Sequence, residues 1–239
     1  MLNQKIILYA LPYAGGHSLV YRNLQPLLKS RIILQSLDPP GHGRRSREPL
    51  MTDLDNIADD LFAQIKAKLS DQPYAIFGHS MGALLAYLLT IRITTAGLPL
   101  PKHLFCSGRG APSALAAELM TPPPKHTLAK DKFWAYIDSL GGIPPELKVH
   151  RELMDYFEPV LRADIQALEC YQYRPPAQPL RLPLTVFYGL DDSEISLNTL
   201  LPWHQESQTS VTFCPLHGSH FGIFEQLPAL AQRILQEFM

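Results

Sequence analysis

The feature that most constrains the fold of this chain is the pentapeptide Gly78-His79-Ser80-Met81-Gly82, which lies between two apolar segments. The segment before it, Tyr74–Phe77, is short and apolar enough for a buried strand, and the one after it, Ala83–Ala96, is apolar nearly all round, as in a helix packed on a sheet. A strand that passes into a helix so abruptly requires a sharp turn, and the flanking glycines let the two backbones come close. The pattern therefore predicts an α/β fold in which a serine hydroxyl stands above the sheet edge.

The rest of the chain repeats this alternation of strand-like and helix-like segments. Helix-period apolar faces cover 54–69 and 227–238. Short apolar runs that end near glycine, proline or aspartate are typical of buried parallel strands. These runs are Lys5–Ala10, Arg31–Leu37, Tyr74–Phe77, His103–Ser107, Leu184–Tyr188 and Val211–Cys214. We therefore predict one α/β domain over residues 1–239, with a mostly parallel central sheet flanked by helices.

One region, about residues 112–179, breaks the alternation, because it has amphipathic helical stripes and proline clusters but no strand-like run. Its two stripes are Phe133, Trp134, Ile137 and Leu140, and Leu153, Phe157, Leu161, Ile165 and Leu168. The region is either a helical part that fills out the core or a lid over a site at the ends of the strands. Its position after a strand end, where α/β proteins build their sites, favours the lid.

Composition argues against several function classes. With 21 basic and 22 acidic residues, the formal charge of −1 favours neither a nucleic-acid partner nor a membrane surface. No apolar segment reaches the roughly 18 residues of a membrane span, and Pro12 interrupts the apolar N-terminal run too early for a signal peptide. The three cysteines form no zinc or redox motif, which indicates a reducing compartment. We expect a soluble, cytoplasmic, monomeric, free-standing protein without a metal.

Ser80 is a candidate nucleophile, the alternative being a tight turn that contains serine by chance. A serine hydroxyl is unreactive at neutral pH unless a base accepts its proton and an acidic residue orients the base. The turn would also aim the N–H of Met81, at the start of the helix, toward the same point as the hydroxyl. In folds with such a turn, the acid and then the histidine follow the serine along the chain.

The acid and the base are each left with two candidates. Asp191 and Asp192 follow the predicted strand Leu184–Tyr188, and Asp192 is preferred because it falls at the position of a G-x-x-D turn. Capping of a turn is the alternative for either residue. Of nine histidines, order and placement leave His217 and His220, and we choose His220 because it directly precedes the last helical segment.

The loop after the first predicted strand, Leu11-Pro12-Tyr13-Ala14-Gly15-Gly16, is the candidate source of a second N–H donor for a developing oxyanion. Its glycines allow the backbone to turn an N–H inward. A plain Gly-Gly turn is the alternative.

Together these motifs resemble those of the type II thioesterases that accompany nonribosomal peptide and polyketide synthases. The matching stretches run nearly end to end: PYAGG at 12–16, PPGHGRR at 39–45, FGHSMGALLAY at 77–87, SGRGAP at 107–112, LRADIQALECYQY at 161–173 and GSHF at 218–221. Their combination in this order is far more specific than G-x-S-x-G alone. The chain departs from the family pattern at Tyr13, where histidine is common, and at His42, where arginine is frequent.

The resemblance implies an α/β-hydrolase fold with a helical lid. It also implies the site: Ser80 as nucleophile, Asp192 as acid, His220 as base, and the N–H groups of Ala14 and Met81 as the oxyanion hole. The implied reaction is hydrolysis of acyl thioesters on the phosphopantetheine arm of acyl or peptidyl carrier proteins, clearing misprimed or stalled groups from a synthase.

No cofactor is implied beyond the arm, which enters with the substrate. Arg44, Arg45, Arg47 and Arg109 are candidates for docking an acidic carrier, with pairing to local acids as the alternative. The rival functions are a fatty-acyl chain-terminating thioesterase or general carboxylesterase with the same triad, and a hydrolase-fold protein that binds a ligand without catalysis.

Overall fold

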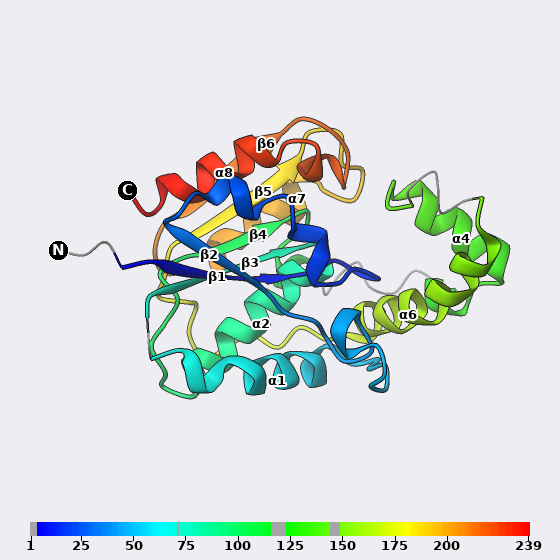
Figure 1. Ribbon diagram of the computed structural model, residues 1–239, viewed down its shortest axis with the longest axis horizontal. Coiled ribbons are helices and arrows are strands. Elements are labelled where there is room, and N and C mark those ends of the chain that lie inside the picture. The colour runs from blue at the N-terminus through cyan, green and yellow to red at the C-terminus, as the bar shows by residue number, and fades with distance from the viewer. Residues whose placement is uncertain (1–3, 71, 116–122, 144–148) are drawn as a thin grey trace.

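A sheet of six parallel strands forms the centre of the computed structural model, which describes residues 4–70, 72–115, 123–143 and 149–239 (Figure 1). The strand order is β2-β1-β3-β4-β5-β6. The strands are β1 Ile6–Leu11, β2 Ile32–Ser36, β3 Tyr74–His79, β4 Leu104–Ser107, β5 Leu184–Gly189 and β6 Val211–Leu216. All six predicted strands are confirmed, with boundaries that differ by at most two residues.

Seven described α-helices and several short 3-10 turns connect the strands. The α-helices are α1 Leu54–Ile65, α2 Met81–Thr95, α3 Pro112–Leu115, α4 Lys130–Ser139, α6 Arg151–Cys170, α7 Leu197–Leu200 and α8 Leu227–Gln236. The 3-10 turns are Ser18–Tyr21, Gln25–Leu28, Gly43–Arg45, Lys66–Lys68, Lys125–Thr127, Leu201–Gln205 and Gly222–Phe224. Within the described ranges, no helix combines the length and the apolar character needed to cross a membrane.

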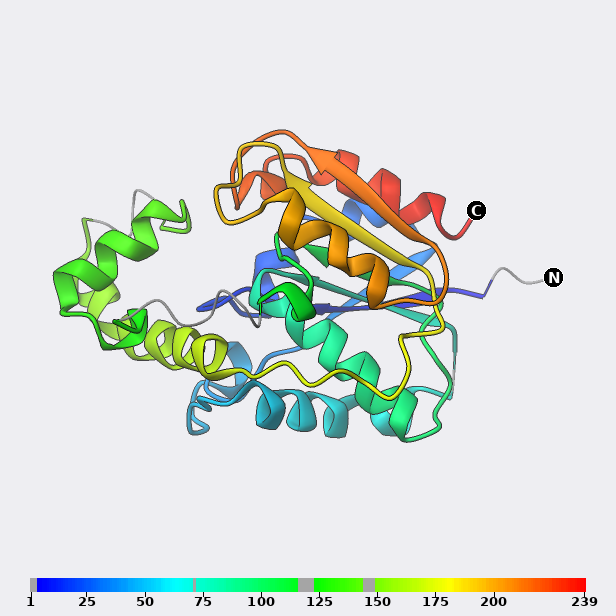
Figure 2. The ribbon, with the colours of Figure 1, turned by 180° about the vertical axis from the view of Figure 1, so that it is seen from behind.

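The sheet separates two apolar cores, because side chains of a strand point alternately to its two faces. On β1, Ile7 and Tyr9 join the core that α1 and α2 cover, whereas Leu8 and Ala10 join the core beneath α8. Figures 1 and 2 show these helices on opposite sides of the sheet. Burial on both faces explains why the strands are nearly continuous apolar runs.

Between β4 and β5 the chain leaves the sheet and builds the helical insertion, which contains α4 and α6 and projects beyond the ends of the strands (Figures 1 and 2). Parts of the predicted lid, 116–122 and 144–148, lie outside the described residues. The helix α6 continues through Pro159, and Leu153, predicted to share its apolar stripe, is 45% exposed. The stripe that faces inward therefore begins one turn later than the sequence suggested.

Side chains of α6 hold the segment that leads into α4. Arg162 donates hydrogen bonds to the carbonyl oxygens of His126 (2.7 Å) and Leu128 (2.9 Å). Glu169 accepts from the main-chain N–H groups of Lys125 (2.6 Å) and His126 (3.1 Å). Both residues belong to the LRADIQALECYQY stretch, so this motif ties the two helices of the insertion together.

Candidate active site

Ser80 occupies the turn between β3 and α2, as the pentapeptide predicted. Its backbone lies in the left-handed region, with φ of 54° and ψ of −116°, a conformation that is costly for a residue with a Cβ. The N–H of Ser80 donates to the carbonyl of Ser107 on β4 (2.8 Å), which fixes the turn to the neighbouring strand. The hydroxyl makes no capping hydrogen bond to the first turn of α2, so it is not used to cap the start of the helix.

The two glycines of the pentapeptide mark places where backbones nearly touch. A Cβ on Gly78 would overlap the main-chain oxygen of Gly82. A Cβ on Gly82 would overlap the main-chain oxygens of Leu11 and Pro12, at the end of β1. The second glycine thus brings the start of α2 against the loop that follows β1, and not only against its own strand.

Asp192 and His220 form a hydrogen-bonded pair. The Nδ1 of His220 lies 2.8 Å from Oδ2 of Asp192, and the side chain of this aspartate is fully buried. Because a carboxylate only accepts, Nδ1 carries the proton and the opposite ring nitrogen is left as an acceptor. The N–H of Glu194 donates to the other carboxylate oxygen (3.0 Å), which fixes the acid in place.

The rejected candidates lie outside this pair. Asp191 and His217 are both exposed. The main-chain N–H of Asp191 instead donates to the carbonyl of Gly218 (3.1 Å), which joins the loop after β5 to the loop that carries His220. Asp192 and His220 are therefore the two candidates that the structure brings together.

His79, next to the nucleophile candidate in sequence, is a buried neighbour of the pair. Its ring centroid lies 5.1 Å from that of His220, and its Nδ1 lies 3.0 Å from the Ser107 hydroxyl. Burial, and after it the charge of His220, holds the pKa of His79 well below its ordinary value. A neutral His79 adds no positive charge beside His220.

The loop after β1 lies beside Ser80, and two of its amides are already used. Gly15 donates to Asp164 of α6 (2.7 Å), and Gly16 donates to the carbonyl of Tyr13 (2.8 Å). The N–H of Ala14, the residue before Gly15, has no hydrogen-bond acceptor among the residues that the structure describes. The N–H of Met81 is in the first turn of α2, where amides have no partner within the helix.

Ser80, Ala14 and His220 all line one cavity of about 370 Å³ between the strand ends and the helical insertion. The insertion supplies mostly apolar walls: Trp134, Ile137, Leu140, Ile143, Phe157, Leu161, Ile165 and Leu168. The polar side chains that line it beside the candidate residues are Tyr13, His17, Arg109, Tyr136 and Glu194. A cavity of this size and character suits a largely apolar ligand whose reacting group meets polar atoms at one end.

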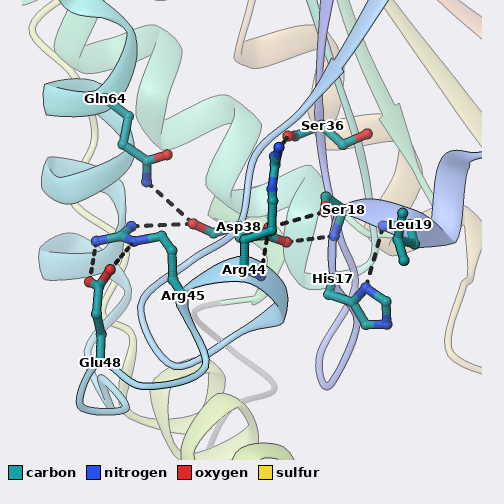
Figure 3. Close-up of polar contacts among 9 residues, drawn as sticks. All are labelled: His17, Ser18, Leu19, Ser36, Asp38, Arg44, Arg45, Glu48 and Gln64. Carbon is teal, nitrogen blue, oxygen red and sulfur yellow. Dashed lines mark hydrogen bonds and ion pairs between the residues drawn. The ribbon is translucent and has the colours of Figure 1, made fainter.

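The basic residues considered for docking have different environments. Arg45 makes ion pairs with Asp60 and Glu48, and Arg44 with the buried Asp38 (3.2 Å), so the alternative of local pairing is confirmed for both. The pairs with Glu48 and Asp38, which Figure 3 shows, lie within the loop after β2, and the pair with Asp60 joins this loop to α1. Arg47 is exposed, and Arg109 lines the cavity.

Sequence reasoning from the residues missed Asp164, which is fully buried and bonds to both Gly15 and His42. A signal was present, because Asp164 lies three residues after Leu161 and four before Leu168, on the apolar face of α6. A carboxylate on such a face requires a partner. The sequence does not indicate which residue this is.

The described residues contain no group of three or more His, Cys, Asp or Glu side chains that could hold a metal ion.

Comparison with known proteins gives one family over nearly the whole chain. A sequence model of the thioesterase domain matches residues 6–238. The linear gramicidin dehydrogenase LgrE of Brevibacillus parabrevis, although named for another reaction, is 32% identical over 98% of this chain and 89% of its own length.

Two solved structures extend this similarity to the fold. The crystal structure of ClbQ from the colibactin NRPS/PKS pathway has a TM-score of 0.89 and 30% identity, and covers 98% of this chain and 96% of its own. YbtT, a type II thioesterase from the yersiniabactin NRPS/PKS biosynthetic pathway, has a TM-score of 0.85 and 30% identity, and covers 100% of this chain and 94% of its own.

Proposed function

The chain belongs to the thioesterase family, and on that premise we propose that it is a type II thioesterase that hydrolyses acyl thioesters held on the phosphopantetheine arm of carrier proteins. In this role it clears misprimed or stalled acyl groups from a nonribosomal peptide or polyketide synthase. The observation that carries the proposal is the hydrogen-bonded Asp192–His220 pair, whose histidine lines an apolar cavity together with Ser80.

The proposed reaction begins with Ser80. His220 accepts the proton of the Ser80 hydroxyl through its free ring nitrogen while the oxygen attacks the thioester carbonyl carbon. The N–H groups of Ala14 and Met81 donate to the oxyanion that forms, and one such donor is worth about 3 kcal/mol in comparable sites.

Collapse of this intermediate breaks the carbon–sulfur bond, and the proton held by His220 goes to the departing pantetheine thiol. Water then attacks the acyl-serine ester while His220 accepts a proton from the water. His220 passes this proton to the Ser80 oxygen as the free acid is released. Asp192 holds the imidazole in the required tautomer and stabilises its positive charge.

The apolar cavity supports an acyl substrate. Most of its apolar walls come from α4, α6 and the residues that follow α4, so the helical insertion is the proposed lid that shapes the space for the acyl group. Carrier-protein domains are the proposed partners, and no cofactor is proposed beyond the pantetheine arm, which arrives with the substrate.

The test compares hydrolysis of one short acyl group attached to a carrier protein, to coenzyme A and to nitrophenol. Each substrate is offered to the parent protein, to Ser80→Ala and to Ser219→Ala, a control in an exposed position next to His220. We expect the carrier-bound thioester to be cleaved fastest, Ser80→Ala to be inactive and Ser219→Ala to resemble the parent.

Fastest cleavage of the nitrophenyl ester would make the protein a general carboxylesterase. A longer fatty-acyl group on the same carrier protein is offered as a fourth substrate, and its faster cleavage would favour a chain-terminating thioesterase. If the parent cleaves none of the substrates, the protein is better described as a non-catalytic binding protein of this fold.

A further inference from the structure

Asp164 joins the helical insertion to the loop after β1. It belongs to α6, its side chain is fully buried, and one carboxylate oxygen, Oδ2, accepts from both Gly15 N–H (2.7 Å) and His42 Nε2 (2.9 Å). The other oxygen, Oδ1, is buried without a hydrogen-bond partner among the described residues. A carboxylate so enclosed retains its charge only if a positive group compensates for the lost water.

His42 supplies that charge. Its Nε2 faces Asp164, and its Nδ1 lies 2.9 Å from the carbonyl oxygen of Pro40. Both partners only accept hydrogen bonds, so both ring nitrogens must carry protons for the two contacts to form, and the ring is then an imidazolium. Burial alone lowers the pKa of His42, but the hydrogen bond and charge of Asp164, followed by the Pro40 carbonyl and the charge of Asp38, raise it overall.

The remaining ionisable groups near His42 do not provide the same contact. Asp38 is already bonded to Ser18 and Arg44, and Arg44 is 77% exposed. His17 and Tyr156 line a second cavity, of about 630 Å³, and His42 lines the same cavity. Asp164 is therefore the carboxylate that bonds directly to the imidazole ring.

The loop that carries Ala14 is fixed at two points by buried carboxylates from different elements. Asp164 binds the N–H of Gly15, the residue that directly follows Ala14. Asp38, at the end of β2, binds the N–H (2.6 Å) and the hydroxyl (3.0 Å) of Ser18, and Figure 3 shows this second contact beside Arg44. Of the two, only the contact at Gly15 is adjacent to Ala14, which lines the cavity.

We propose that Asp164, kept charged by protonated His42, is a positioning residue that orients the Ala14 N–H as an oxyanion donor, and that loss of the proton from His42 loosens this loop and limits hydrolysis at alkaline pH. The proposal rests on the function proposed above, because it assigns Ala14 a role in the same reaction. The direction of the pH effect follows from the pair of Asp164 and His42. The contact is complete while His42 is protonated and weakens as the pH rises through the titration of His42.

The first experiment replaces Asp164 by asparagine and measures kcat and KM with an acetyl group on a carrier protein. We expect kcat to fall on the order of 10²-fold with KM little changed, because a displaced oxyanion donor affects the transition state and not substrate binding. Glu206→Gln is the matched control, since Glu206 is also buried (1% exposed) but bonds to Tyr87 and Tyr173, away from this loop. Equal kcat in Asp164→Asn and the parent would overturn the proposal.

The second experiment uses His42→Gln, which keeps an N–H donor for Asp164 but cannot titrate, and remains available if Asp164→Asn does not fold. Rates are measured from pH of about 6 to about 9, the range in which histidine side chains change charge. We expect the parent rate to fall on the alkaline side and the rate of His42→Gln to stay level there. An alkaline fall of the same size and midpoint in both proteins would refute the role of His42.

The parent protein separates the two proposals. If the parent does not hydrolyse the carrier-bound thioester, the proposed function fails. If it does, and neither variant behaves as expected, only the positioning role of Asp164 and His42 is lost.

Discussion

Replacing Ser80 by glycine should remove hydrolysis and stabilise the fold at the same time. Ser80 has φ of 54° and ψ of −116°, a backbone conformation that costs a residue with a Cβ about 1–3 kcal/mol and glycine very little. The change removes no packed group of any size, because the side chain lines the cavity and makes no capping hydrogen bond. Glycine also gives the unfolded chain more conformational entropy, which offsets this gain by about 0.5–1 kcal/mol. The net gain is therefore about 1 kcal/mol.

Thermal unfolding of Ser80→Gly and Ser80→Ala measures this difference directly. Alanine removes the same hydroxyl but keeps the Cβ, so Ser80→Ala should unfold within about 1 °C of the parent. Ser80→Gly should unfold about 2–4 °C higher, as expected for 1 kcal/mol in a chain of this length. If Ser80→Gly unfolds at or below the temperature of Ser80→Ala, the strain inferred from the backbone angles does not exist.

Three further predictions follow from the geometry. Asp192→Asn should lower kcat about 10⁴-fold by disturbing the tautomer of its histidine partner, whereas exposed Asp191→Asn should leave kcat nearly unchanged, and steady-state kinetics of both compares them. Gly82→Ala should cost more than about 4 kcal/mol, measured by urea unfolding or as loss of folded protein, since its Cβ would overlap main-chain oxygens after β1. Burial, with the charge of Arg233 adding to it, lowers the pKa of His103 to about 4. Urea unfolding should therefore show that about 3 kcal/mol of stability is lost as the pH falls from about 6.5 to 4, and His103→Gln should reduce this dependence on pH.

The elements that the sequence predicted correctly are those encoded by local patterns. Apolar runs bounded by turn residues predicted each of the six strands, because parallel strands buried on both faces tolerate few polar residues. The turn at Ser80 was equally readable, since Gly78 is required by a backbone contact with Gly82 within the same turn. Gly82 itself is required by a contact with Leu11 and Pro12, which are distant in sequence. The predicted helix after this turn begins two residues earlier than expected, directly after the serine.

Local patterns were insufficient where neighbouring residues were equivalent in sequence. Asp191 and Asp192 are adjacent carboxylates after the same strand, and only the direction of the turn decides that one is buried against His220 and the other exposed. Pro159 is a different case, because the general rule would place a proline at a helix end but this one lies inside α6. The helix therefore continues against the local preference of its proline.

By itself, the amino-acid sequence determined the α/β class, the strand order along the chain, the nucleophile candidate and the short sets from which its acid and base come. Only the tertiary structure decided which residues hold the loop that carries Ala14. Asp164 bonds to Gly15 across 149 positions and to His42 across 122, so no periodicity or motif spacing relates them. The physical reason is that short-range patterns record which face of a helix or strand is buried, whereas the partner of a buried charge is set by how distant elements pack together.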